Sequence, residues 1–208
     1  MTPDDRSLGD LRRLAEDETV FPEATTAGAQ WQRVVMNEAI AAHLDSLEPA
    51  SRSAAEISGD SHASRGWKEY TSLNYPDFDV CAPVVERGSF DVVICEQVLE
   101  HVVDPWGAAA NLLELTAPGG HLVVSTPFLI KVHELPLFGM NDYWRFTPRG
   151  LRALLERAGF VVDAVETWGN VECVVGNLRR WSAYRSWHPI DNDLDLAVQV
   201  WAFARNLG

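Results

Sequence analysis

The sequence is poor in cysteine and in long apolar runs. Its 208 residues include only 3 cysteines, Cys81, Cys95 and Cys173, which are widely spaced and form no CxxC pair. This pattern argues against a disulfide scaffold and against a cysteine-rich zinc site. The apolar runs fall well short of the roughly 20 residues that a membrane span requires. The first residues show neither a basic stretch nor an apolar run, so we expect a cytoplasmic protein without a secretory signal.

Basic residues are also scarce relative to acidic ones. The chain carries 30 aspartates and glutamates against 17 lysines and arginines, which gives a formal net charge of -13. Such a chain repels phosphate backbones and anionic lipid, so nucleic acid and membrane surfaces are not expected as its main partners. With 47% apolar residues, the composition is otherwise that of a globular protein with one sizeable core.

After residue 50, apolar runs of strand length alternate with longer helical stretches, which predicts a parallel α/β sheet. Residues 1–30 are polar and acidic, and we expect a leader there with a short helix near residues 8–16. Residues 30–47 have helical spacing and predict an amphipathic helix laid on the domain. The expected division is therefore a leader with this helix over 1–50 and a domain over 51–208. Strands are expected at 54–58, 69–73, 91–95, 121–126, 160–167 and 197–204, and helices at 105–115, 148–158 and 178–187.

Two of the predicted strands end in polar residues. Residues 89–105 read SFDVVICEQVLEHVVDP, and residues 117–127 read APGGHLVVSTP. In an open parallel sheet, ligands bind just beyond the carboxyl ends of the strands, which places Glu96 and Gln97 on the rim of a site. A carboxylate directly after four apolar strand residues is costly unless it faces a polar cleft.

Together these segments resemble the central half of class I S-adenosylmethionine-dependent methyltransferases of the small-molecule, type 11-like kind, over about residues 52–170. The resemblance implies a Rossmann-like α/β fold: a seven-stranded, mostly parallel sheet with helices on both faces and an antiparallel last strand, here 197–204. It also implies S-adenosyl-L-methionine as the cofactor. A nicotinamide dehydrogenase on a similar core is disfavoured because the G-x-G-x-x-G motif is absent.

The resemblance implies that the cofactor lies across the ends of the first strands. Residues 54–60, AAEISGD, keep the family's acid and one glycine but lack its further glycines, so the glycine-rich loop is degenerate. The segment that follows is short for two full strand–helix units, so residues 68–73 are the expected second strand and Phe78–Val80 stands in for the third. The expected cofactor-binding residues are Glu56, Ser58, Gly59, Asn74, Asp79, Glu96 and Gln97.

The segment after the fifth strand is long, polar and aromatic, and residues 141–148 read NDYWRFTP. It resembles the acceptor loop of a subgroup of these enzymes, often of bacterial saccharide or secondary metabolism. Methyl transfer from a sulfonium needs positioning and, for a hydroxyl or ammonium acceptor, the removal of a proton, a task that suits histidine. The expected catalytic residues are His133, His101 and Tyr143, and the expected substrate-binding residues are Asp142, Trp144 and Arg145.

Alternatives remain open for two of these residues. His101 is either a base or a hydrogen-bonded residue that ties its helix to neighbouring loops, and Arg145 either clamps an acidic acceptor or pairs with Asp142 or Glu134. The other histidines are too scattered to indicate a metal site, so no metal is assigned.

The sequence therefore predicts a methyltransferase that acts on an oxygen or nitrogen atom of a small molecule. The alternative is a catalytically silent, cofactor-binding partner subunit of another enzyme, which the degenerate glycine loop suggests. Whether the protein forms a homodimer is left open.

Overall fold

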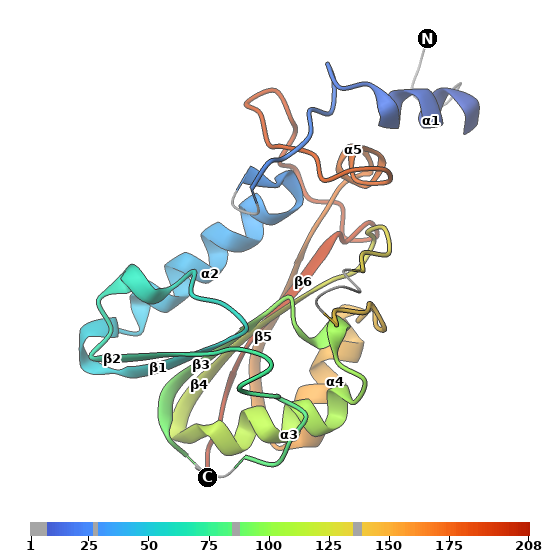
Figure 1. The fold of residues 1–208 in the computed structure, drawn as a ribbon. Helices are drawn as coiled ribbons and strands as arrows, with labels where there is room; N and C mark the ends of the chain where they lie inside the picture. Colours follow the sequence, from blue (N-terminus) through green and yellow to red (C-terminus); the bar gives the residue numbers. More distant parts are fainter. Residues whose placement is uncertain (1–7, 27–28, 85–87, 135–138) are drawn as a thin grey trace. The chain divides into compact units, whose positions relative to one another are not determined.

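The computed structural model of the chain describes residues 8–26, 29–84, 88–134 and 139–208 (Figure 1). The chain divides into two compact units. Within the described residues, one unit comprises the segment up to Glu38 together with Leu129–Val132 and Thr167–Gln199, and the other comprises Ala39–Phe128, His133–Glu166 and Val200–Gly208. The expected division between a leader, 1–50, and a domain, 51–208, stays a prediction.

A six-stranded sheet has the strand order β2-β1-β3-β4-β6-β5. Strands β1 to β4 pair in parallel, with Glu56 opposite Ile94 and Glu96 opposite Ser125. The strands are β1 Ser53–Ile57, β2 Glu69–Leu73, β3 Phe90–Glu96, β4 Thr116–Pro127, β5 Val161–Trp168 and β6 Gln199–Arg205. The expected α/β fold is thereby confirmed.

The last strand, β6, runs antiparallel to its neighbours, as expected. Arg205, near the end of β6, pairs with Asp163, near the start of β5. Trp201, earlier in β6, donates its indole N–H to Glu166, later in β5. This opposite order defines an antiparallel pair. On the side of β4, Asn206 exchanges backbone hydrogen bonds with Gly119 and Gly120 near the start of that strand.

Helices cover both faces of the sheet (Figure 1). Helix α2, Val34–Ser46, lies on one face, where His43 stacks on Phe203 of β6. Helices α3, Pro105–Leu115, and α4, Pro148–Ala158, lie on the other face. Each of these two helices begins with a proline, and the side chain of the preceding residue, Asp104 or Thr147, caps it. The core of β3 consists of Val92–Cys95, all fully buried, as a parallel strand covered on both faces requires.

Two sequence predictions about elements are wrong. Residues 78–80, expected as the third strand, form turns, so the described residues contain six strands where seven were expected. The amide of Phe78 donates to the carbonyl of Asn74, and the Asp79 carboxylate accepts the amide of Cys81. Such local hydrogen bonds from an aspartate favour a turn over a sheet ladder.

The helix expected at residues 178–187 is also absent. Residues 181–184 pair instead with two segments near the start of the described chain, through isolated bridges between Glu23 and Ser182 and between Gln30 and Ala183. A short helix, α5, Val171–Gly176, precedes them, capped by the Asn170 side chain. In the same unit lies α1, Leu8–Glu16, as expected. No helix among the described residues is long and apolar enough to cross a membrane.

Candidate active site

A cavity of about 870 Å³ lies at the carboxyl ends of β1, β2 and β3. This is the edge at which open parallel sheets bind ligands, and the volume falls within the range of small-molecule sites. Of the expected cofactor-binding residues, the four that line the cavity are Ser58, Asn74, Asp79 and Gln97. Cys81 also lines it, but burial raises the pKa of its thiol, which keeps the sulfur protonated.

Glu56 is almost fully buried, with 4% exposure, and its carboxylate binds the chain itself. It accepts the amides of Ser61 and His62 and the hydroxyl of Tyr70, at 3.0, 2.9 and 2.6 Å. Burial and the hydrogen bond to Glu56 raise the pKa of Tyr70, so this hydroxyl remains a donor. A Cβ atom at Gly59 would lie 2.6 Å from Glu56 Oε1, so the glycine permits this closure. Glu56 therefore orders the loop that follows β1.

Glu96, at the end of β3, is joined to the same loop by His62. The His62 Nε2 atom lies 2.5 Å from Glu96 Oε1, and the Nδ1 atom accepts a hydrogen bond from Arg65 Nε at 2.9 Å. Since Nδ1 accepts, Nε2 carries the proton that is donated to Glu96. His62 was not among the residues predicted from the sequence. Its position in the loop that replaces the family's glycines could have indicated that it belongs to the site. Among the described residues, Glu56, Gly59 and Glu96 do not line the cavity.

Two cavity residues have left-handed backbone conformations. Ser58 has φ of 57° and Gln97 has φ of 56°, and each directly follows the end of a strand. Residues other than glycine rarely adopt this conformation, and it is concentrated at functional sites. Gln97 is held by its amide, which donates to the carbonyl of Ser125, and by its side chain, which donates to Ser125 Oγ.

Replacing Ser58 by glycine is expected to stabilise the protein relative to replacement by alanine, by about 1 kcal/mol, because glycine adopts positive φ without a Cβ clash. The free energy of unfolding from urea titrations of the two variants measures the difference. The alanine variant is the matched control, since it also lacks the hydroxyl. Equal stability of the two variants would show that the turn at Ser58 is not strained.

His101 also lines the cavity. Its Nδ1 atom lies 2.6 Å from the carbonyl oxygen of Asn141, which can only accept, so Nδ1 carries a proton and Nε2 of the neutral ring carries a lone pair. Nε2 lies 3.7 Å from Oε1 of Glu100, whose side chain is fully buried. His101 thus ties its segment to the 141–144 loop and also presents an imidazole to the cavity, so the two readings of this residue are compatible.

His133 contacts His101 edge to face, with ring centroids 4.9 Å apart, but among the described residues it does not line the cavity. Its Nδ1 atom lies 3.1 Å from Asp142 Oδ2. One nitrogen or oxygen atom each of Glu100, His101 and His133 lies within 4.8 Å of the others. This spacing suits an acid–base cluster. The alternative is that the three side chains bind a divalent cation, which a chelator would remove.

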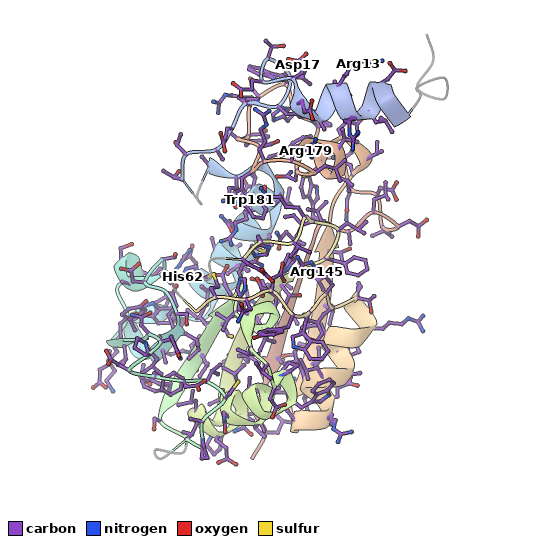
Figure 2. The ribbon with its side chains drawn as sticks, turned by 45° about the vertical axis from the view of Figure 1, so that its right-hand side comes forward. Arg13, Asp17, His62, Arg145, Arg179 and Trp181 are labelled. Atoms are coloured by element: carbon purple, nitrogen blue, oxygen red, sulfur yellow. The ribbon has the colours of Figure 1, made fainter. Side chains whose placement is uncertain are left out.

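The three residues expected to bind substrate make their described contacts within the chain. Asp142, with a side-chain exposure of 1%, forms a two-armed ion pair with Arg145, the residue labelled in Figure 2 at the same end of the sheet as His62. Burial acts to raise the pKa of Asp142, but Arg145 and the amide of His133 outweigh it and hold that pKa below its usual value. Trp144 donates its indole N–H to the carbonyl of Val102. Their substrate-binding role stays a prediction, whereas Tyr143 lines the cavity.

The sheet order, the antiparallel last strand and the cavity at the strand ends define a Rossmann-like class I methyltransferase fold. A family model described as a methyltransferase domain matches residues 20–165. The chain therefore belongs to this family of S-adenosylmethionine-dependent methyltransferases, as the sequence resemblance implied.

Several curated relatives share the name ubiquinone biosynthesis O-methyltransferase. That of Ralstonia nicotianae is 41% identical over 66 residues, which are 31% of this chain and 28% of the relative. That of Cupriavidus pinatubonensis is 39% identical over 40% of this chain and 38% of the relative, and that of Coxiella burnetii is 26% identical over 80% and 68%. The first two matches thus span less than half of the relatives' length.

Solved structures share the fold at low sequence identity. A Burkholderia thailandensis 1,6-didemethyltoxoflavin-N1-methyltransferase, with bound 1,6-didemethyltoxoflavin and S-adenosylhomocysteine, has a TM-score of 0.56 at 13% identity over 86% of this chain and 80% of that one. A Mesorhizobium loti S-adenosylmethionine dependent methyltransferase has a TM-score of 0.52 at 14% identity over 79% and 96%. The [4+2]-cyclase SpnF has a TM-score of 0.53 at 14% identity over 95% and 93%.

Proposed function

We propose that this protein transfers a methyl group from S-adenosylmethionine to an oxygen or nitrogen atom of a small molecule. The observation that carries the proposal is one cavity that joins polar residues at three strand ends, Ser58, Asn74 and Gln97, to the imidazole of His101. The three curated relatives described above are named as O-methyltransferases, which favours oxygen as the acceptor atom. Saccharides and secondary metabolites remain the acceptor classes that the acceptor-loop motif suggests.

The residues at the strand ends fit the cofactor. Asn74 and Gln97 offer amide donors and acceptors, Asp79 offers a carboxylate, and Ser58 offers a hydroxyl at a turn that opens into the cavity. When bound, S-adenosylmethionine supplies a methyl group on a sulfonium leaving group. Glu56, Gly59 and Glu96 contribute indirectly, by ordering the loop behind Ser58.

The chain's own part in the reaction is to hold the acceptor in line and to take its proton. In this proposal, Nε2 of His101 takes the proton that the acceptor oxygen or nitrogen loses when it is methylated. Glu100 Oε1 lies 3.7 Å from this nitrogen, so an ionised Glu100 would stabilise the imidazolium that forms. Tyr143, on the same cavity, supplies a hydroxyl that positions the acceptor.

Binding is tested by calorimetry with S-adenosylhomocysteine. We expect the wild-type protein to bind it, and Asn74→Ala and Gln97→Ala each to raise Kd about tenfold, as the loss of one hydrogen bond predicts. Asn37→Ala, in α2 and not among the residues that line the cavity, is the matched control and should leave Kd unchanged. Absence of binding by the wild-type protein would contradict the proposal.

Turnover is tested by release of S-adenosylhomocysteine with phenols, carboxylates and amines as acceptors. Formation of a methylated product identifies an enzyme. Tight binding with no turnover on any acceptor would favour the alternative function, a catalytically silent partner subunit, which the degenerate loop after β1 suggests.

A further inference from the structure

We propose that Asp142 is a positioning residue, which fixes the ring of His133 in the Nδ1–H form and, through that ring, the orientation of His101. The inference rests on the proposed function, in which His101 is the base. It gives Asp142 a task different from the contact with substrate that the sequence suggested.

The carboxylate of Asp142 is surrounded by donors from its own chain. Oδ2 accepts the amide of His133 at 2.8 Å and Arg145 Nη2 at 2.6 Å, and it lies 3.1 Å from His133 Nδ1, while Oδ1 accepts Arg145 Nη1. With a side-chain exposure of 1%, the group has no surface to offer a ligand. An incoming acceptor would have to displace one of these charge-assisted hydrogen bonds, which are among the stronger ones in proteins.

These contacts fix which nitrogen of His133 holds the proton. The pKa of Asp142 lies below its usual value because Arg145 and the His133 amide outweigh burial, so the group is an ionised acceptor near neutral pH. An ionised carboxylate only accepts, and therefore His133 Nδ1 must donate. Nε2 is then the atom of His133 that carries a lone pair. A carboxylate that selects a histidine tautomer in this way is a recurrent arrangement at active sites.

The ring of His133 contacts the ring of His101 directly, so the position of one limits the position of the other. The two rings meet edge to face, at 87° and with centroids 4.9 Å apart. The neighbours of Asp142 in the chain also contact the segment that contains His101. The Asn141 carbonyl accepts a hydrogen bond from His101 Nδ1, and the Tyr143 amide donates to the Glu100 carbonyl. A shift of Asp142 would therefore disturb His101 both through the ring of His133 and through the backbone.

Among the described residues, Glu100 lies beside His101 and Asp142 lies beside His133, while Arg145 forms an ion pair with Asp142. Because Arg145 balances the charge of Asp142, this pair orients His133 without adding net charge to the cluster.

The test is nitrogen-15 NMR of the histidine rings in the full chain, which reports the protonated nitrogen without turnover. In the wild-type protein at pH 8 we expect the Nδ1–H form for His133. In Asp142→Asn, whose amide can donate, we expect a shift toward the Nε2–H form, and turnover lower by about 10- to 100-fold. Asp163→Asn is the matched control, since it breaks a comparable aspartate–arginine pair with Arg205, and it should change neither.

Different results would refute the proposed methyltransferase activity and the proposed role of Asp142. No turnover by the wild-type protein would refute the proposed function, while the ring tautomer would still decide the role of Asp142. A wild-type His133 protonated at Nε2 overturns the inference even if Asp142→Asn does not fold. An Asp142→Asn protein with unchanged turnover and pH profile overturns it as well. So would activity that is lost with a chelator and restored by a divalent cation, because the cluster would then hold a metal.

Discussion

The variant His101→Asn is expected to lose turnover by about 100- to 10,000-fold, the range that a positioned general base contributes. Asparagine can still donate a hydrogen bond to the Asn141 carbonyl, so the contact that ties this segment to the 141–144 loop need not be lost. The melting temperature and the Kd of S-adenosylhomocysteine should therefore stay close to wild-type values. Initial rates of S-adenosylhomocysteine release, measured across pH, give the effect, and the acidic limb of the pH–rate profile should flatten.

His133→Asn is the informative companion variant. His133 contacts the ring of His101 but lies outside the cavity lining among the described residues, so its loss should lower turnover less than the loss of His101. His43→Asn, in α2 and stacked on Phe203, controls for the general effect of removing a histidine. A larger loss in His133→Asn than in His101→Asn would make His133 the base, as the sequence favoured.

Glu56→Ala is expected to lower the free energy of unfolding by about 3–5 kcal/mol. The substitution leaves three donors without their acceptor: the buried amide of His62, the amide of Ser61 and the hydroxyl of Tyr70. The buried donor costs about 1–3 kcal/mol when unsatisfied, and the two part-buried donors add less. The loop behind Ser58 would loosen, so the affinity for S-adenosylhomocysteine should fall with stability. Urea titration and calorimetry on the same samples measure the two effects.

Two milder variants separate a role through the loop from direct contact with the cofactor. Tyr70→Phe removes one of the three donors and should cost about 1 kcal/mol of stability with little change in Kd. Glu56→Gln keeps one oxygen acceptor and should fall between wild type and Glu56→Ala. A Glu56→Ala protein of normal stability with greatly weakened cofactor binding would show that the carboxylate touches the cofactor directly.

The elements that the sequence predicted best are those whose limits are set by neighbouring residues. Helices α3 and α4 have the expected bounds because Asp104–Pro105 and Thr147–Pro148 provide a cap and a first helical residue, and because Gly159, with φ of 115°, ends α4. Strand β3 was recognisable from its run of buried apolar residues. The residues at the strand ends were predictable for the same reason, since the end of a parallel strand marks the ligand edge of the sheet.

The sequence by itself determined the α/β class, the family and three strand-end residues of the cavity, Ser58, Asn74 and Gln97, because each of these follows from local patterns. Tertiary structure alone decided what depends on distant partners. Residues 178–187 do not form the expected helix because Pro22, Ala24 and Ala29 form backbone hydrogen bonds with residues 181–184, which local periodicity does not reveal. In the same way, only folding brings His62 to Glu96, 34 positions away, and His101 to Asn141, 40 positions away.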